Sequence, residues 1–297
     1  MYIPIFIVAQ IQKERRVYYL DCSYSMVRFK IWKIVCNNLI KAIENVQDET
    51  TELIVVPFAF DNKHHPRLNA YKELATAQGK QILISKINKI KPIKNTMTYH
   101  SDALKDFCNY RINPERVNYI FFMTDGQNEE KPDPMPGLLC RWGNRFNGKS
   151  VYGFYVMLHE EAANPKVDSV CKSQAHLWKV ATADVNINLV RLQSSAIFNA
   201  KNDRFFDLQI ACGDTSGKSF GASFPSNCPY KVKKTEKRSN SIRVWVEPIS
   251  CQKLPVLSNN NLIIRMTGGG PFDFLVTEKI PIRCEFKPER SLKISVR

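Results

Sequence analysis

One stretch constrains this chain more than any other, Val17-Tyr18-Tyr19-Leu20-Asp21-Cys22-Ser23-Tyr24-Ser25-Met26. An apolar run rich in strand-forming residues ends at an aspartate, and an amphipathic helical pattern begins directly after two serines. Because Asp21, Ser23 and Ser25 alternate, their oxygens can turn toward one point in a loop that leaves the carboxyl end of a parallel strand. One carboxylate with neutral hydroxyls suits Mg²⁺, whereas a calcium loop needs more acidic ligands. The simpler alternative is that both serines only cap the following helix.

Two later stretches can contribute to the same point. Residues Asn95 to Leu104 offer hydroxyl groups just before a helical pattern. Residues Tyr119 to Gly126 form a strand of the buried type that ends in Thr124-Asp125-Gly126. Each stretch reaches the end of a strand or the start of a helix, where ligand sites of open α/β sheets lie.

This ordered set, Asp-x-Ser-x-Ser, then a threonine, then Thr-Asp-Gly, resembles the von Willebrand factor A (vWA) domain and its metal-ion-dependent adhesion site, over residues 12 to 193. The resemblance implies that Ser23 and Ser25 bind the ion directly, that Asp21 and Asp125 often act through water, and that Thr98 is the threonine ligand. Thr96 is the alternative.

The chain departs from the family pattern at two places near the ion. Tyr24 stands where the family usually has glycine, and Thr96-Met97 stands where it usually has a glycine pair. Neither change removes a ligand. Both bear on the local shape of the loops, and Tyr24 is placed to crowd or contact whatever approaches the ion.

Residues 1–193 predict a doubly wound, mostly parallel sheet with helices on both faces, a Rossmann-like α/β architecture, because strand and helix patterns alternate. The patterns predict strands over 17–20, 53–60, 117–124, 151–157 and 185–192, and helices over 26–46, 69–77, 79–90, 101–111 and 166–178.

Residues 194–297 predict an all-β, sandwich-like domain, because short alternating runs are separated by Gly, Pro and Asn turns. The expected strands are 205–211, 242–246, 262–266, 274–276, 282–286 and 292–296. Gly213 to Ser219 looks like a phosphate-binding loop, but its glycine spacing is one residue short and no helix pattern follows, so a hairpin turn is expected. A strand over residues 1–11 is expected to pair with this domain, since Val17 to Leu20 already supplies the first strand of the other sheet.

Composition indicates a folded protein that works in a reducing cytoplasm and not in a membrane. Hydrophobic residues make up 44% of the chain, and no apolar run reaches the roughly 18 residues of a spanning helix. Nine cysteines at irregular spacing indicate neither a disulfide framework nor a zinc site, and residues 1–11 lack the basic start of a signal peptide. All nine are expected to be thiols.

The formal net charge of +15 makes nucleic acid an alternative partner. The basic residues are spread along the chain, with one run at Lys86, Lys89, Lys91 and Lys94 and a denser one from Lys231 to Arg238. The second run has no repeated aromatic residues between its cations, so a solvated surface is the plainer interpretation. The first run leads into the threonine loop and could favour an acidic partner.

Taken together, these patterns predict a non-enzymatic, Mg²⁺-dependent protein-binding module whose ion is completed by an Asp or Glu of a protein partner. Mn²⁺ or Ca²⁺ could replace Mg²⁺. No candidate general base stands near the ligand set, which argues against metal-assisted hydrolysis. The resemblance further implies an adaptor in an intracellular, multi-protein stress or defence complex of the bacterial type. The alternative is a nucleic-acid-binding protein with a structural metal site.

Overall fold

The computed structural model of the protein describes residues 13–59, 67–94, 98–126, 128–146, 150–157, 165–174, 176–181, 188–194, 205–224, 230–248, 260–269, 273–277 and 281–282. The chain separates into two compact units, and the second begins at Asn188. The strand predicted over residues 1–11 lies outside the described residues, so its pairing stays a prediction. No helix among the described residues is long and apolar enough to cross a membrane.

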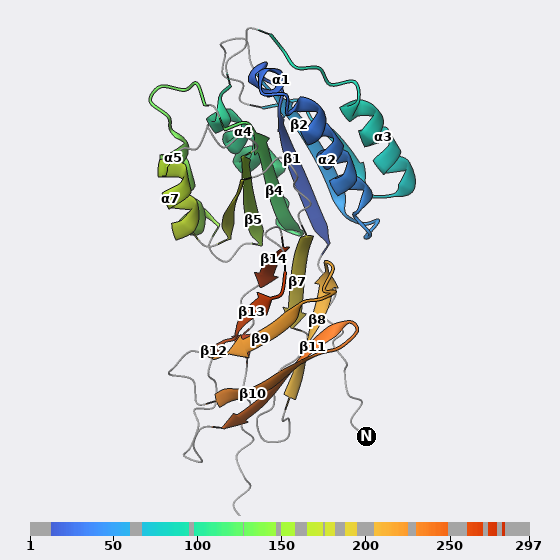
Figure 1. The fold of residues 1–297 in the computed structure, drawn as a ribbon, viewed down its shortest axis with the longest axis vertical. Coiled ribbons are helices and arrows are strands. Elements are labelled where there is room, and N and C mark those ends of the chain that lie inside the picture. The colour runs from blue at the N-terminus through green and yellow to red at the C-terminus, as the bar shows by residue number, and fades with distance from the viewer. Residues whose placement is uncertain are drawn as a thin grey trace, which may run out of the picture. The chain divides into compact units, whose positions relative to one another are not determined.

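The first unit is built on a six-stranded sheet in the order β3-β2-β1-β4-β5-β6 (Figure 1). Only the edge strand β3 runs antiparallel to its neighbour. The strands are β1 (Glu14–Asp21), β2 (Glu52–Phe58), β3 (Tyr71–Leu74), β4 (Val117–Thr124), β5 (Val151–Met157) and β6 (Leu177–Ala181). All eight residues of β4 are buried, as expected for a strand covered on both faces.

Helices cover both faces of this sheet, with α2 and α3 on one side and α4, α5 and α7 on the other (Figure 1). The helices are α1 (Ser25–Arg28), α2 (Trp32–Glu44), α3 (Ala77–Ile87), α4 (His100–Asp106), α5 (Met135–Leu139), α6 (Trp142–Arg145) and α7 (Pro165–Ser173), and α4 continues into a π-helical segment, η1 (Phe107–Arg111). The side of α4 to α7 encloses a core that includes Tyr19, Phe107, Phe122 and Trp142. The predicted α/β fold class is thereby confirmed.

Three predictions within this unit differ from the structure. Residues 69–77 were expected to be helical, but Tyr71–Leu74 form strand β3, which pairs antiparallel with β2 and is fastened by the Lys72–Glu52 ion pair of 2.9 Å. The helix predicted over 166–178 ends at Ser173, because His176 takes a positive φ of 62° and the chain turns into β6. The helix predicted over 26–46 is interrupted at Lys30, which also has a positive φ, of 60°.

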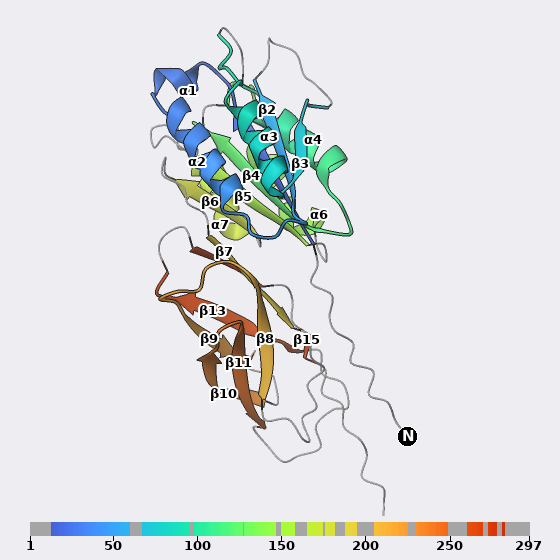
Figure 2. The same ribbon diagram turned by 90° about the vertical axis from the view of Figure 1, so that its right-hand side faces the viewer.

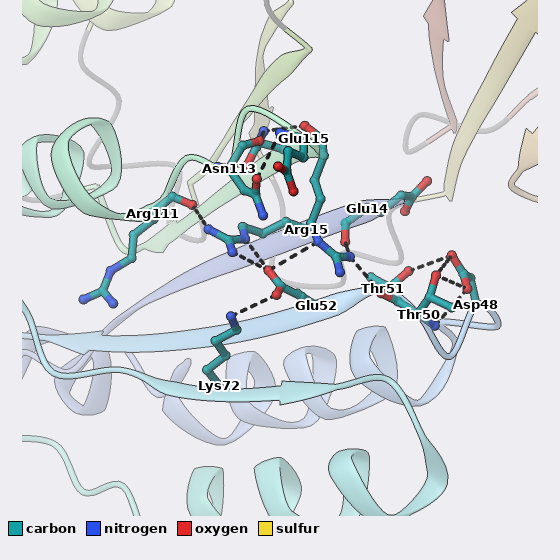
Figure 3. A network of polar contacts seen from close by, with 12 residues as sticks. Glu14, Arg15, Asp48, Thr50, Thr51, Glu52, Lys72, Arg111, Asn113 and Glu115 are labelled. Atoms are coloured by element: carbon teal, nitrogen blue, oxygen red, sulfur yellow. Dashed lines mark hydrogen bonds and ion pairs between the residues drawn. The ribbon is translucent and has the colours of Figure 1, made fainter. Parts of the chain in front are cut away.

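Polar contacts close the sheet at the amino-terminal ends of its strands (Figure 3). Glu52 pairs there with Arg15 and, at 2.9 Å, with Lys72. The guanidinium of Arg15 also donates to the carbonyl oxygen of Arg111, at 2.7 Å. The charges of Glu52, Arg15 and Lys72 at this end of the sheet are therefore paired with one another.

The second unit contains a five-stranded sheet in the order β10-β11-β8-β7-β14 and two ribbons, β13-β9 and β12-β15. Its strands are β7 (Asn188–Ser194), β8 (Phe205–Cys212), β9 (Ser219–Ser223), β10 (Tyr230–Lys237), β11 (Ser241–Pro248), β12 (Asn260–Asn261), β13 (Ile263–Thr267), β14 (Asp273–Thr277) and β15 (Pro281–Ile282). One core joins Leu208 and Val244 of the larger sheet to Phe220 and Ile264 of the β13-β9 ribbon. Two layers around one core give the predicted sandwich-like domain.

The boundary and several details of the second unit differ from the sequence predictions. The strand predicted over 185–192 forms as β7, but it pairs in the five-stranded sheet, and the unit begins before the predicted residue 194. Residues 213–218 do connect two strands, yet β8 and β9 belong to different sheets, so the turn is not a hairpin. The basic run from Lys231 lies largely on strand β10. The strand predicted over 292–296, and most of that over 282–286, lie outside the described residues.

Candidate metal centre

Two aspartates meet at the carboxyl end of the first sheet. Asp21 is the last residue of β1, and Asp125 follows the last residue of β4, the parallel neighbour of β1. The register pairs Leu20 with Met123, so the two strands end at the same level. Both carboxylates are fully buried. Such a position at the carboxyl ends of parallel strands is where open α/β sheets bind ligands.

The loop between β1 and α1, called the first loop here, turns the two predicted serines toward each other. The backbone N–H of Ser23 donates to Oδ1 of Asp21 at 2.8 Å, and the hydroxyl oxygens of Ser23 and Ser25 lie 2.7 Å apart. Residue Tyr24 occupies the N-cap of helix α1, and no side chain caps that helix. The serine hydroxyls are thus paired with each other instead of capping α1.

The threonine loop, which contains Thr98 and precedes α4, is hydrogen-bonded to the segment that follows Asp125. Thr98 is buried, its N–H donates to Oε2 of Glu129 at 2.9 Å, and its carbonyl oxygen accepts from the N–H of Glu129 at 3.1 Å. This brings the main chain of Thr98 beside the loop after β4. The alternative ligand, Thr96, lies outside the described residues.

A chain of hydrogen bonds that the sequence did not reveal leads away from Asp21. The hydroxyl of Thr124 donates to Oδ2 of Asp21 at 2.7 Å and lies 3.1 Å from Nε2 of His100. Because the single hydroxyl proton of Thr124 goes to Asp21, Nε2 of His100 must be the donor in the second contact. The other ring nitrogen, Nδ1, then accepts from the hydroxyl of Tyr155, at 2.9 Å.

Burial fixes the charge state of the histidine in this chain of hydrogen bonds. The pKa of His100 is lowered to about 3, because its fully buried ring is kept from solvent, so the ring is neutral and has one N–H. The N–H of Gly126 also donates to Oγ1 of Thr124, at 3.1 Å. The threonine hydroxyl therefore makes one donated and two accepted bonds, which is its full capacity.

The carboxylates of the site repel each other. The pKa of Asp21 is raised to about 7, first by burial and then by the negative charge of Asp125, although bonds from Thr124 and Ser23 partly oppose the rise. A cation between the two carboxylates would remove this penalty. The available donors are two carboxylates and neutral hydroxyls, and the part of the chain that the structure describes contains no group of three or more His, Cys, Asp or Glu arranged for a metal. This donor set fits a hard cation such as Mg²⁺ and not zinc, which prefers nitrogen and sulfur.

The mostly parallel sheet, the helices on both faces and the ordered aspartates and hydroxyls at the carboxyl edge define a vWA-like α/β domain. No family model matches the chain, and no curated protein matches it.

Among solved structures, proximal thread matrix protein 1 from the mussel byssus is similar, at 12% identity and a TM-score of 0.45 over 58% of this chain and 44% of that one. A further structure of the mussel protein, described as having a zinc-occupied MIDAS motif, gives 17% identity and a TM-score of 0.42 over 60% of this chain and 44% of that one. The chain thus spans less than half the length of the mussel protein. A von Willebrand factor type A protein from Catenulispora acidiphila gives 13% identity and a TM-score of 0.43 over 87% of this chain and 63% of that one.

Proposed function

We propose that the first unit is a non-enzymatic protein-interaction module that binds one Mg²⁺ through Asp21, Ser23, Ser25, Thr98 and Asp125. The observation that carries the proposal is the pair of fully buried aspartates at the ends of adjacent parallel strands, beside two serine hydroxyls 2.7 Å apart. Mn²⁺ or Ca²⁺ would use the same oxygens. When bound, the ion supplies a coordination position for a carboxylate of the partner.

Described residues around Asp21 orient this site for binding. Thr124 and the N–H of Ser23 each hold one oxygen of Asp21. His100 belongs to the hydrogen-bond chain that leads from Asp21, but its two ring nitrogens are engaged by Thr124 and Tyr155. A neutral, buried ring with both nitrogens in use is a poor general base. This supports a binding role.

We propose a protein as the partner because two cations of the second unit, one of them in its basic run, are engaged by neighbouring acids. Lys231 pairs with Glu247 at 3.0 Å, and Arg243 binds Asp207 through two contacts of 2.7 and 2.8 Å. A phosphate-binding surface would instead leave its cations to the nucleic acid. From the resemblance alone, we infer that the partner belongs to a cytoplasmic, multi-protein stress or defence complex.

The decisive experiment compares wild type, Asp21→Ala and Asp125→Ala, each with magnesium or a chelator. Calorimetric Mg²⁺ binding and partner capture should both fall by at least about tenfold in the two variants and in chelator. Glu115→Gln is a matched control, because Glu115 is an exposed carboxylate at the opposite end of the sheet (Figure 3). Undiminished capture by a folded Asp21→Ala variant would mean that another surface binds the partner. Binding to RNA or DNA that falls steeply with salt would favour the nucleic-acid alternative.

A further inference from the structure

Three exposed apolar side chains lie together beside the candidate metal centre. Tyr24 is 45% exposed, Val27 39% and Ile93 47%. Ile93 is joined to the first loop, because its N–H donates to the carbonyl oxygen of Cys22 at 2.8 Å and its backbone forms a parallel bridge with Ser23. The N–H of Val27 donates to the carbonyl oxygen of Tyr24 at 3.0 Å. We call these three residues the apolar rim.

The side of the unit next to the apolar rim is strongly basic. Residues 22–43 and 75–94 contain no Asp or Glu. Their cations are Arg28, Lys30, Lys33, Lys41, Lys80, Lys86, Lys89, Lys91 and Lys94. These two segments include α1, α3 and all of α2 except its last residue, Glu44. Helices α2 and α3 lie side by side on one face of the sheet (Figures 1 and 2).

Basic residues also reach the apolar rim itself. The ammonium group of Lys94 lies 5.8 Å from the centre of the Tyr24 ring, and Lys91 and Lys94 are both exposed. A field of one sign around a binding site raises the local concentration and the association rate of a partner of opposite charge. The charge therefore selects for an acidic partner, whereas the apolar rim selects for an uncharged side chain.

We propose that the site takes an acidic protein segment in which the metal-binding Asp or Glu is next to an apolar residue. This inference rests on the proposed metal-dependent function and specifies the partner for that same site. The carboxylate completes the ion, the apolar side chain packs on Tyr24, Val27 and Ile93, and further acids face Lys91 and Lys94. The aliphatic side chains of Val27 and Ile93 favour a protein over a nucleic acid, since a phosphate backbone offers nothing apolar to pack on them.

The test uses the full chain and an array of synthetic peptides. Each peptide has a central Asp or Asn, a neighbouring Leu or Ser, and acidic or neutral flanks, and binding is measured with magnesium or a chelator. The strongest binding is expected for Asp with Leu and acidic flanks, only with magnesium. Ile93→Ser should weaken binding to the Leu peptides by about tenfold and leave the Ser peptides unchanged. The double variant Lys91→Glu with Lys94→Glu should remove the preference for acidic flanks.

Two variants serve as matched controls. Leu74→Ser changes an apolar residue that is likewise 45% exposed, but Leu74 pairs with Glu52 at the opposite end of the sheet. Lys13→Glu reverses an exposed lysine just before β1, at the amino-terminal end of the sheet and outside the two basic segments. Neither should alter peptide binding.

The outcomes separate this inference from the function on which it rests. Metal-dependent binding of Asp peptides with no preference for Leu, unaffected by Ile93→Ser, would overturn the apolar rim as a specificity surface while leaving the metal-dependent function intact. Equal binding of Asp and Asn peptides, with or without metal, would overturn both. No peptide binding at all, together with oligonucleotide binding that Lys91→Glu and Lys94→Glu abolish, would replace the acidic segment with a nucleic acid.

Discussion

Replacing Thr124 by valine should reveal how firmly the buried hydrogen-bond chain holds Asp21. Valine has nearly the shape of threonine, so the change removes a hydroxyl group without opening a cavity. The hydroxyl donates to Oδ2 of Asp21 at 2.7 Å and accepts from Nε2 of His100 at 3.1 Å. Both partners are fully buried, so water cannot replace the lost bonds.

The expected cost follows from these two contacts. A hydrogen bond to a charged group contributes about 1.5–3 kcal/mol, and a buried donor left without an acceptor costs about 1–3 kcal/mol. Together they predict that Thr124→Val lowers the free energy of unfolding by about 3–5 kcal/mol at pH 8 in chelator. Mg²⁺ affinity should fall as well, because Asp21 loses one of the two bonds that orient it.

The assay is urea unfolding followed by calorimetric titration with Mg²⁺. Thr51→Val is the matched control, because Thr51 is equally buried but its hydroxyl makes, among the described residues, one long contact of 3.4 Å with Asp48. That control should cost about 1 kcal/mol or less. In a His100→Leu background the cost of Thr124→Val should shrink, since the histidine donor is already gone. A Thr124→Val protein as stable as Thr51→Val would refute the reasoning.

Three further predictions concern stability and pH. Asp106→Asn should destabilise the protein by about 3–5 kcal/mol in urea unfolding, because the buried Arg111 loses its charged partner, and should leave Mg²⁺ affinity unchanged. The pKa of Asp21 is raised to about 7 in the folded protein, so folding favours the protonated carboxyl. In the metal-free protein this contribution to the free energy of unfolding should be complete below about pH 4 and be lost as the pH rises through about 7. Mg²⁺ affinity should increase over that interval, and urea titrations in chelator from pH 4.5 to 8 should show the stability trend in wild type but not in Asp21→Asn. Gly79→Ala should lower the melting temperature despite the higher helix propensity of alanine, because its Cβ would lie 2.0 Å from the carbonyl oxygen of Leu74.

The central strands could be predicted from the sequence because they are buried on both faces. Strands β4 and β5 form at the predicted residues. The edge strands could not be predicted, since they are short and their form depends on pairing. The sequence Tyr71–Leu74 alternates exposed with half-buried positions, and its strand form follows from the register with β2. Strand β6 begins within the stretch whose pattern predicts a helix. Its Trp178 packs against the neighbouring strand by stacking on Phe154, at 5.0 Å between ring centres.

The ligand residues stand in sequence motifs, but the residues that orient them do not. Asp21, Ser23 and Ser25 lie in one short stretch, so their proximity follows from local geometry. His100 contacts Thr124 and Tyr155, which are 24 and 55 residues away, and only the packing of α4 against β4 and β5 brings them together. The one available signal was a histidine between the predicted threonine ligand and Ala103-Leu104.

Two buried carboxylates of the first unit have different partners. Asp106 is as buried as Asp21, but it receives two contacts from the guanidinium of Arg111, at 2.8 and 3.2 Å. The hydrogen bonds that the described residues donate to Asp21 come from neutral groups, the N–H of Ser23 and the hydroxyl of Thr124. Neutral donors orient a carboxylate and lower its pKa, but they do not cancel its charge, so burial and the neighbouring Asp125 still raise the pKa of Asp21 to about 7. A buried acid that the fold orients without neutralising is suited to a cation from outside the chain, and a metal ion bound there would stabilise the folded state by mass action.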